Sequence, residues 1–216
     1  MLKKISIVSL LTVLFSISFT AFAAANHETM KEDVVQVKSW NHFAELLLTL
    51  HKKQISGKDI KQTETMGGYA DSPEYFREVK YTDSKSGNLL SIVQWEVSNP
   101  EAVHSIEVFI YDKNNRVIRD YIAAFLPYQR NAPVQTLINL HTYNGDLHSF
   151  KQFDGSKDLV YEYCDGKLNG KDIQIRLFED DLVSNDYDTR QLFKSAEYKT
   201  CFKGAHSKLG KYIRPQ

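Results

Sequence analysis

The chain has 216 residues, of which 42% are hydrophobic and 12% aromatic, enough for one domain with a sizeable core. Lys and Arg number 27 and Asp and Glu also number 27, so the formal net charge at pH 7 is zero. Such a balance provides no basic field to gather phosphates, so we expect no nucleic-acid partner.

The first 25 residues have the three parts of a secretory signal peptide. Lys3 and Lys4 give a positive start, residues 5–22 are apolar or small without a charge, and residues 23–25 are alanines that suit cleavage. An uncleaved anchor is the alternative, because about 18 such residues approach a membrane-spanning length. We predict an exported protein, periplasmic or secreted, with no membrane span in its mature part.

A helix is predicted near the start of the mature chain. Residues 26–38 are polar and suggest a flexible lead-in, which leaves residues 39–216 as a single α+β domain. Ser39 is a candidate N-cap for a helix over residues 40–53. Apolar residues recur there at spacings of three and four, which predicts one stripe facing a core: Trp40, Phe43, Leu47 and Leu50.

Beyond this helix the pattern changes to that of short strands separated by turn residues. Met66–Tyr69 contains two glycines and is expected to be a loop, and a further helix is expected over residues 189–203. Strands linked in sequence by short turns form an antiparallel meander, and a wide sheet usually curls. We therefore predict an α+β fold with a curved, half-barrel-like meander packed on the N-terminal helix. The eight expected strands are 75–82, 89–97, 104–111, 117–125, 137–142, 147–152, 159–164 and 173–178.

The register of one hairpin can be argued from its turn. Residues 113–115 form the expected loop, so that Tyr111 faces Val117. Strict alternation then places Ile106 opposite Ile122, within an aliphatic ladder on one side of the hairpin.

Cys164 and Cys201 are the two cysteines of the chain. In an oxidising compartment an even pair most simply forms a disulfide. A nucleophilic or metal-binding thiolate is the alternative, but neither cysteine has a second cysteine at the spacing of a C-x-x-C motif. We predict a structural Cys164–Cys201 bridge.

Two histidines are candidate metal ligands. If Asn144 and Gly145 form a two-residue turn, His141 faces His148 across the hairpin, close enough for both imidazoles to bind one zinc or copper ion. A longer loop would instead place His148 opposite Tyr143 and separate the rings somewhat. Two half-exposed strand histidines without a metal are the plainer interpretation, because no motif reinforces the pair.

An enzymatic role would depend on His104, Glu107 and Asp120, which are acid–base residues in neighbouring predicted strands. A hydrolase would require these groups to converge in one pocket. The sequence has no G-x-S-x-G motif and no glycine-rich phosphate loop before a helix. Ordinary solvated strand residues are the alternative interpretation.

Aromatic residues are frequent in the central predicted strands, and they suit either a core or a surface that binds an apolar or ring-shaped ligand. Our first hypothesis is accordingly a non-enzymatic exported protein that binds a small molecule or protein partner through its curved sheet and needs no cofactor. A hydrolase-type enzyme and a metal-binding accessory protein are the alternatives. The aromatic residues concerned are Trp95, Phe109, Tyr111, Tyr121 and Phe125.

Overall fold

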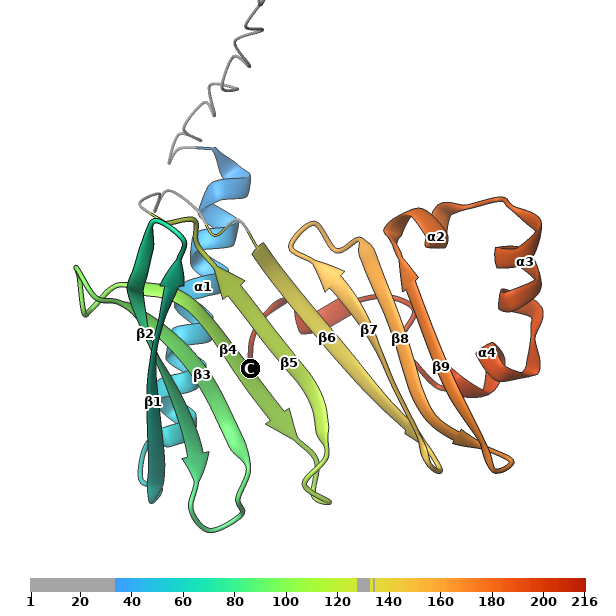
Figure 1. Cartoon of the computed structure of the whole chain (residues 1–216), viewed down its shortest axis with the longest axis horizontal. Helices are drawn as coiled ribbons and strands as arrows, with labels where there is room; N and C mark the ends of the chain where they lie inside the picture. Colours follow the sequence, from blue (N-terminus) through green and yellow to red (C-terminus); the bar gives the residue numbers. More distant parts are fainter. Residues whose placement is uncertain (1–33, 128–132, 134) are drawn as a thin grey trace, which may run out of the picture.

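Nine β-strands form one open antiparallel sheet in which each strand pairs with the next along the chain (Figure 1). The computed structural model describes residues 34–127, 133 and 135–216. The curved α+β meander predicted from the sequence is confirmed, with one strand more than expected. The strands are β1 (Ile60–Tyr69), β2 (Ser72–Asp83), β3 (Leu89–Glu96), β4 (Val103–Tyr111), β5 (Val117–Ala124), β6 (Gln135–Asn144), β7 (Leu147–Asp154), β8 (Leu159–Leu168) and β9 (Lys171–Phe178).

The additional strand is β1, at the edge of the sheet. Most of its side chains are exposed, so its sequence lacks the alternation that marks a half-buried strand. The expected loop at Met66–Tyr69 is wrong, because Gly67 still pairs with Phe76 and the ladder is interrupted only before Tyr69. Gly68 is needed at this point, since a Cβ atom there would lie 2.0 Å from the Ser72 carbonyl oxygen.

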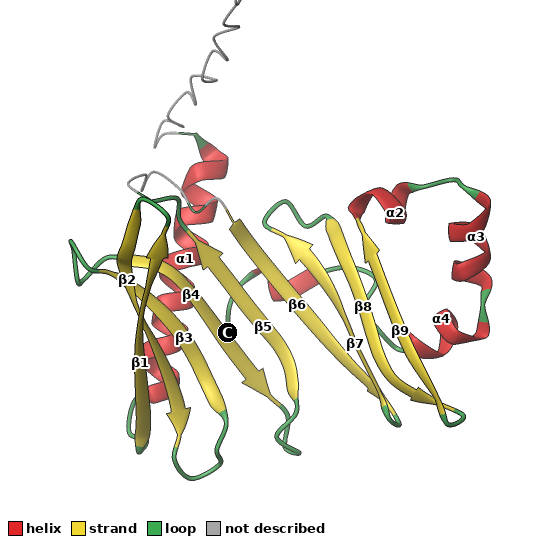
Figure 2. Ribbon diagram, in the orientation of Figure 1, coloured by secondary structure: helices red, strands yellow, loops and turns green. Residues whose placement is uncertain are grey.

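One long helix, α1 (Val35–Ile55), packs across β3, β4, β5 and β6 (Figure 2). It begins at Val35 rather than Trp40, and its N-cap Val34 makes no side-chain hydrogen bond, so the prediction of Ser39 as N-cap is wrong. Val37 is fully buried, so tertiary packing rather than capping extends the helix. Residues 1–33, including the predicted signal peptide, lie outside the described residues. No helix in the described part of the chain is long and apolar enough to span a bilayer.

The main core lies between α1 and one face of the sheet, which we call the helix face. The predicted stripe is confirmed for Phe43, Leu47 and Leu50, which are buried against this face. Leu47 is fully buried, and burial of such a side chain contributes about 2–3 kcal/mol to folding. The stripe determines which face of the sheet α1 covers. Its partners on the strands include Val79, Val93, Ile106, Tyr121 and Ile138.

A β-bulge changes the expected register of the β4–β5 hairpin. Tyr111 pairs with Val117 as predicted, but the register shifts between Ile110 and Tyr111. Ile106 therefore pairs with Ala123 and not with Ile122, and the predicted aliphatic ladder is wrong. The extra residue sends Tyr121 into the core on the helix face and leaves Asp120 on the opposite face.

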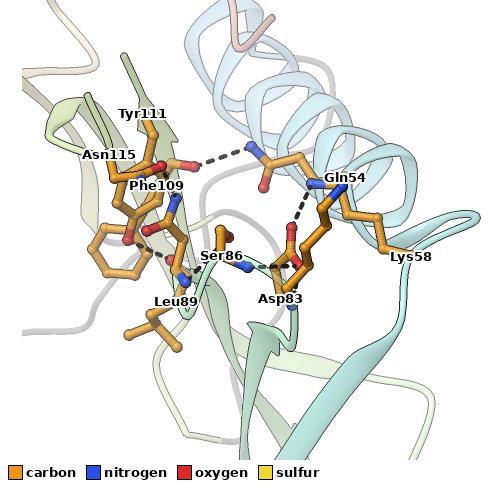
Figure 3. Close-up of polar contacts among 10 residues, drawn as sticks. Gln54, Lys58, Asp83, Ser86, Leu89, Phe109, Tyr111 and Asn115 are labelled. Atoms are coloured by element: carbon orange, nitrogen blue, oxygen red, sulfur yellow. Dashed lines mark hydrogen bonds and ion pairs between the residues drawn. The ribbon is translucent and has the colours of Figure 1, made fainter. Parts of the chain in front are cut away.

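Polar contacts fix the C-terminal end of α1 to the sheet (Figure 3). The Gln54 amide donates to the Phe109 carbonyl oxygen over 3.0 Å, and Lys58, just after the helix, lies 3.6 Å from Asp83 at the end of β2. The Tyr111 hydroxyl donates to the Leu89 carbonyl oxygen over 2.8 Å. The Gln54 contact attaches α1 to β4, the strand that carries Glu107, and the Tyr111 bond joins β4 to β3.

The C-terminal segment forms short helices instead of the single helix expected over residues 189–203. They are α2 (Glu179–Val183), α3 (Tyr187–Lys194) and α4 (Ala196–Cys201). The break occurs at Ser195, whose side chain accepts a hydrogen bond from the Tyr198 backbone and caps α4.

The predicted disulfide is confirmed, and it joins α4 to β8 through Cys201 and Cys164. Both sulfurs lie in a second apolar cluster, with Leu147, Ile175 and Leu177 of the neighbouring strands. Cys164 lies opposite Ser149 of β7, and Ser149 lies opposite Thr142 of β6. Thr142 is two residues from buried Leu140, and residues two apart in a strand point to the same face. The second cluster therefore also lies on the helix face. The face opposite α1 is therefore also the face opposite α4.

Replacing both cysteines with alanine should lower the free energy of unfolding by about 3–4 kcal/mol. The bridge closes a loop with a sequence separation of 37, and its removal restores conformational freedom to the unfolded chain. Urea denaturation followed by circular dichroism measures the change. An unchanged midpoint and slope in the double variant would contradict this account, and the mass of the unreduced wild-type chain provides the control that the bridge has formed.

Candidate functional site

The candidate site lies on the side of the sheet opposite α1 and α4, which we call the open face. In the described part of the chain, no helix packs over the centre of this face, which is turned toward the viewer in Figure 1. Its side chains come from positions that alternate with the buried core positions along each strand. They include polar residues that are nevertheless shielded from solvent by their neighbours.

A line of four side chains crosses the open face on four consecutive strands. Asp120 Oδ2 of β5 lies 2.6 Å from His141 Nε2 of β6, and His141 Nδ1 lies 2.9 Å from His148 Nε2 of β7. His148 Nδ1 then lies 3.6 Å from Asp165 Oδ1 of β8, an ion-pair distance that is too long for a hydrogen bond. We call Asp120, His141, His148 and Asp165 the histidine relay.

The two imidazoles of the relay are joined edge to edge rather than stacked face to face. Their rings are parallel within 4° and their centroids are 5.1 Å apart, while the facing nitrogens are 2.9 Å apart. Rings stacked face to face could not combine such a short nitrogen separation with such a long centroid separation. From Asp120 to His148, the relay therefore has the geometry of a hydrogen-bonded chain.

Buried amides hold the Asp120 end of the relay in place. Asp120 is 3% exposed and accepts a hydrogen bond of 2.6 Å from Asn139 Nδ2, on the residue directly opposite in β6. Asn139 Oδ1 in turn accepts from Gln152 Nε2 over 3.0 Å. Both oxygens of the Asp120 carboxylate are thus engaged, one by Asn139 and one by His141. This network positions the His141 ring.

Protonation along the open face is shifted by burial and by neighbouring charge. Burial, with the negative charges of Asp120 and Glu78, raises the pKa of Glu107 from 4.5 to about 7. Burial, followed by the charge of His141, lowers the pKa of His148. Glu107 therefore titrates near neutral pH, whereas His148 resists taking up a proton.

The predicted histidine pair is close together, although the turn assumed for it is wrong. Gly145 and Asp146 form the loop, because Asn144 pairs with Leu147. His148 consequently lies opposite Tyr143, and His141 is its diagonal neighbour on the same face.

A tertiary contact explains why Asn144 is outside the turn. Its side-chain amide donates to the Lys203 carbonyl oxygen over 2.9 Å, beyond the end of α4. Sequence reasoning also missed the partnership of Asp120 with His141, since the register of β5 on β6 depends on the long connection between them.

The contacts of the described residues do not join the three residues proposed for a hydrolase: His104, Glu107 and Asp120. Glu107 and Asp120 share the open face, and the negative charge of Asp120 helps to raise the pKa of Glu107. His104 instead packs at the start of β4, with its ring stacked on Phe76 at 5.6 Å between centroids and its Nε2 2.5 Å from the Tyr69 hydroxyl. Asp120 has His141 as its imidazole partner.

A row of aromatic rings continues the open face beyond the relay. Phe150 lies 5.3 Å from Tyr163 and 5.8 Å from Tyr161, and Tyr161 lies 5.0 Å from Phe178, all between ring centroids. Phe178 is 61% exposed. We call Phe150, Tyr161, Tyr163 and Phe178 the aromatic row.

The aromatic residues named from the sequence divide between the two faces. Tyr121 is 1% exposed within the core, and Trp95 packs against that core. Phe109 lies on the open face because it pairs with Asp120. The aromatic row itself comes from β7, β8 and β9, which the sequence interpretation had not singled out.

Comparisons with known proteins identify no relative. No protein-family model matches the chain, and neither the curated proteins nor the solved structures include a match.

The free energy of unfolding should depend on pH through Glu107. Because its pKa is raised to about 7, this carboxyl keeps its proton to a higher pH in the folded state than in the unfolded state. Its contribution to the free energy of unfolding is therefore lost as the pH rises from about 4.5 through 7. The loss amounts to roughly 3 kcal/mol at most. The Glu107→Gln variant should therefore gain stability over the wild type at pH 8 but not at pH 4, as measured by urea denaturation.

The matched control is Glu74→Gln, which replaces an exposed glutamate on β2. Its stability difference from the wild type should be the same at both pH values. A Glu107→Gln variant that follows the wild-type pH profile throughout would show that the Glu107 carboxyl ionises normally.

Proposed function

We propose that this protein is an exported, non-enzymatic binding protein that holds an apolar or ring-shaped ligand, or a partner's side chains, on the aromatic row. The observation that carries the proposal is the row itself, four neighbouring rings on a face that no helix of the described residues covers. Aromatic rings provide large contact areas at low entropic cost, and their faces accept flat or apolar groups.

Export is supported by the N-terminal sequence and by the disulfide. Residues 1–25 have the composition of a signal peptide, and the Cys164–Cys201 bridge persists in oxidising compartments. A ligand on the aromatic row would then be met outside the cytoplasm.

A binding role is favoured over hydrolysis by the contacts of the relay. A histidine that activates a nucleophile requires a ring nitrogen directed at a hydroxyl or thiol. Both ring nitrogens of His141 are already engaged, one with Asp120 and the other with His148. The two cysteines are joined to each other and supply no thiol.

Charged groups at the row suggest how a ligand is oriented. The Arg176 guanidinium lies 5.7 Å from the Tyr163 ring centroid, and Asp165 of the relay follows two residues after Tyr163 on the same face of β8. A ligand with a flat apolar body and one polar edge would place its body on the rings and its edge toward Arg176 or Asp165. Such a division of contacts is typical of small-molecule sites, where a few polar groups set orientation.

Removing the half-buried Tyr161 ring and the exposed Phe178 ring should weaken binding. The Tyr161→Ala/Phe178→Ala variant loses contact area worth roughly 2–4 kcal/mol, or about 30-fold or more in affinity. Native mass spectrometry of protein recovered from an exported fraction should show a bound mass in the wild type that the variant loses. Anilinonaphthalene sulfonate, a fluorescent aromatic probe, serves as a second readout.

Tyr187→Ala provides the control, because Tyr187 is 68% exposed on α3 and does not belong to the row. It should retain the bound mass and the probe fluorescence of the wild type. Equal binding by the row variant and this control would refute the proposal, as would a wild type that binds neither a copurifying molecule nor the probe.

A further inference from the structure

We infer that His141 and His148 form a binding site for one transition-metal ion that favours imidazole, Cu²⁺ or Zn²⁺. This site goes beyond the proposed ligand binding and does not depend on it. The inference is based on the arrangement of the whole histidine relay, in which each ring has a carboxylate on one side and the other ring on the opposite side.

The outer nitrogens of the pair are directed at carboxylates. His141 Nε2 lies 2.6 Å from Asp120, and His148 Nδ1 lies 3.6 Å from Asp165. A histidine that binds a metal commonly donates its second ring N–H to a carboxylate, which fixes the tautomer and makes the inner nitrogen a better donor. His141 has this support at hydrogen-bond distance, and His148 has the Asp165 carboxylate at ion-pair distance on the opposite side of the site.

The inner nitrogens then face each other as lone pairs. If the outer nitrogens carry the protons, Nδ1 of His141 and Nε2 of His148 have none of their own, at a separation of 2.9 Å. Two lone pairs so close repel unless a positive species joins them. A shared proton can do so, and a metal ion can replace that proton. The two flanking carboxylates balance the added positive charge.

The dimensions of the pair suit a metal after a small movement. Nitrogens bound at about 2.0–2.1 Å are about 2.9 Å apart at a right angle and about 3.3 Å apart in a tetrahedral site. Because the rings now lie edge to edge, one of them must tilt so that both lone pairs point to the same ion. His148 is the less constrained of the two rings, since its side chain is 34% exposed although it stacks on Tyr143, whereas His141 is 10% exposed and hydrogen-bonded to Asp120.

The number of protein ligands determines how tightly the metal ion is held. The described residues contain no group of three or more His, Cys, Asp and Glu side chains that could hold a metal ion. The site therefore offers two imidazole nitrogens and leaves the remaining positions to water. Such a site binds less tightly than a closed structural one. Among divalent ions it favours Cu²⁺, which heads the Irving–Williams order, with Zn²⁺ next to it.

The test is titration of the folded, disulfide-bonded protein with Cu²⁺, followed by calorimetry and electron paramagnetic resonance. All proteins carry His27→Ala, so that this histidine near the mature N-terminus cannot compete for the ion. We expect one Cu²⁺ per chain, with hyperfine structure from two nitrogens. His148→Phe should abolish the two-nitrogen signal, and Asp165→Asn should weaken binding about 10- to 100-fold by removing an outer carboxylate.

The matched control is His42→Ala, since the His42 side chain is 67% exposed on α1. It should bind Cu²⁺ as the parent protein does, and Zn²⁺ should compete for the same site. The inference is overturned if His148→Phe retains the two-nitrogen signal, if Asp165→Asn binds with the parent's affinity, or if His42→Ala loses the ion. Asp165→Asn keeps the test decisive if His148→Phe does not fold, because its change is confined to one atom of a half-exposed side chain.

Discussion

Burial of the apolar stripe of α1 is the constraint on which the rest of the structure depends. Leu47 and its neighbours commit one face of the sheet to the core, and alternation along the strands commits every second side chain to the other face. Glu107 and Asp120 thereby lie on the face that no described helix covers, where neighbouring side chains rather than a helix shield them from solvent. The chemistry of the open face is thus a consequence of how the helix packs on its opposite side.

The open face joins two environments that rarely lie side by side on one sheet. At its centre, Asp120 and Asn139 are almost fully buried, so their hydrogen bonds are strong and their geometry is fixed. Toward β9 the rings of Phe150, Tyr161 and Tyr163 are half-buried, and Phe178 at the end of the row is exposed. A rigid polar centre can orient a bound group, and an exposed apolar margin can supply contact area. This combination is the basis of the binding role proposed above.

Much of the architecture could be predicted from the sequence, because turn residues and alternation mark β2 to β9 and a spaced apolar stripe marks α1. Strand β1 was not predicted, because an exposed edge strand shows no alternation of apolar and polar residues. The histidine pair was found because both residues flank one short turn, but Asp120 was not assigned to it. The register of β5 on β6 cannot be read from a short turn, because a long connection joins these strands. A bulge near Tyr111 also reverses the two faces of β5 relative to those that simple alternation predicts. Asn144 shows the same limit, since a contact with the C-terminal segment outweighs its local preference for the turn.

Strand β8 carries the disulfide and the site on its two sides. Cys164 is directed toward α4, while Tyr161, Tyr163 and Asp165 are directed toward the open face. Ser149 of β7 reinforces the attachment by donating to the Cys201 carbonyl oxygen over 2.9 Å. The disulfide therefore fixes to α4 the strand that carries Tyr161 and Tyr163 of the aromatic row and Asp165 of the relay. Because reduction would remove this covalent link, the redox state of the compartment governs how firmly the strand under these side chains is held.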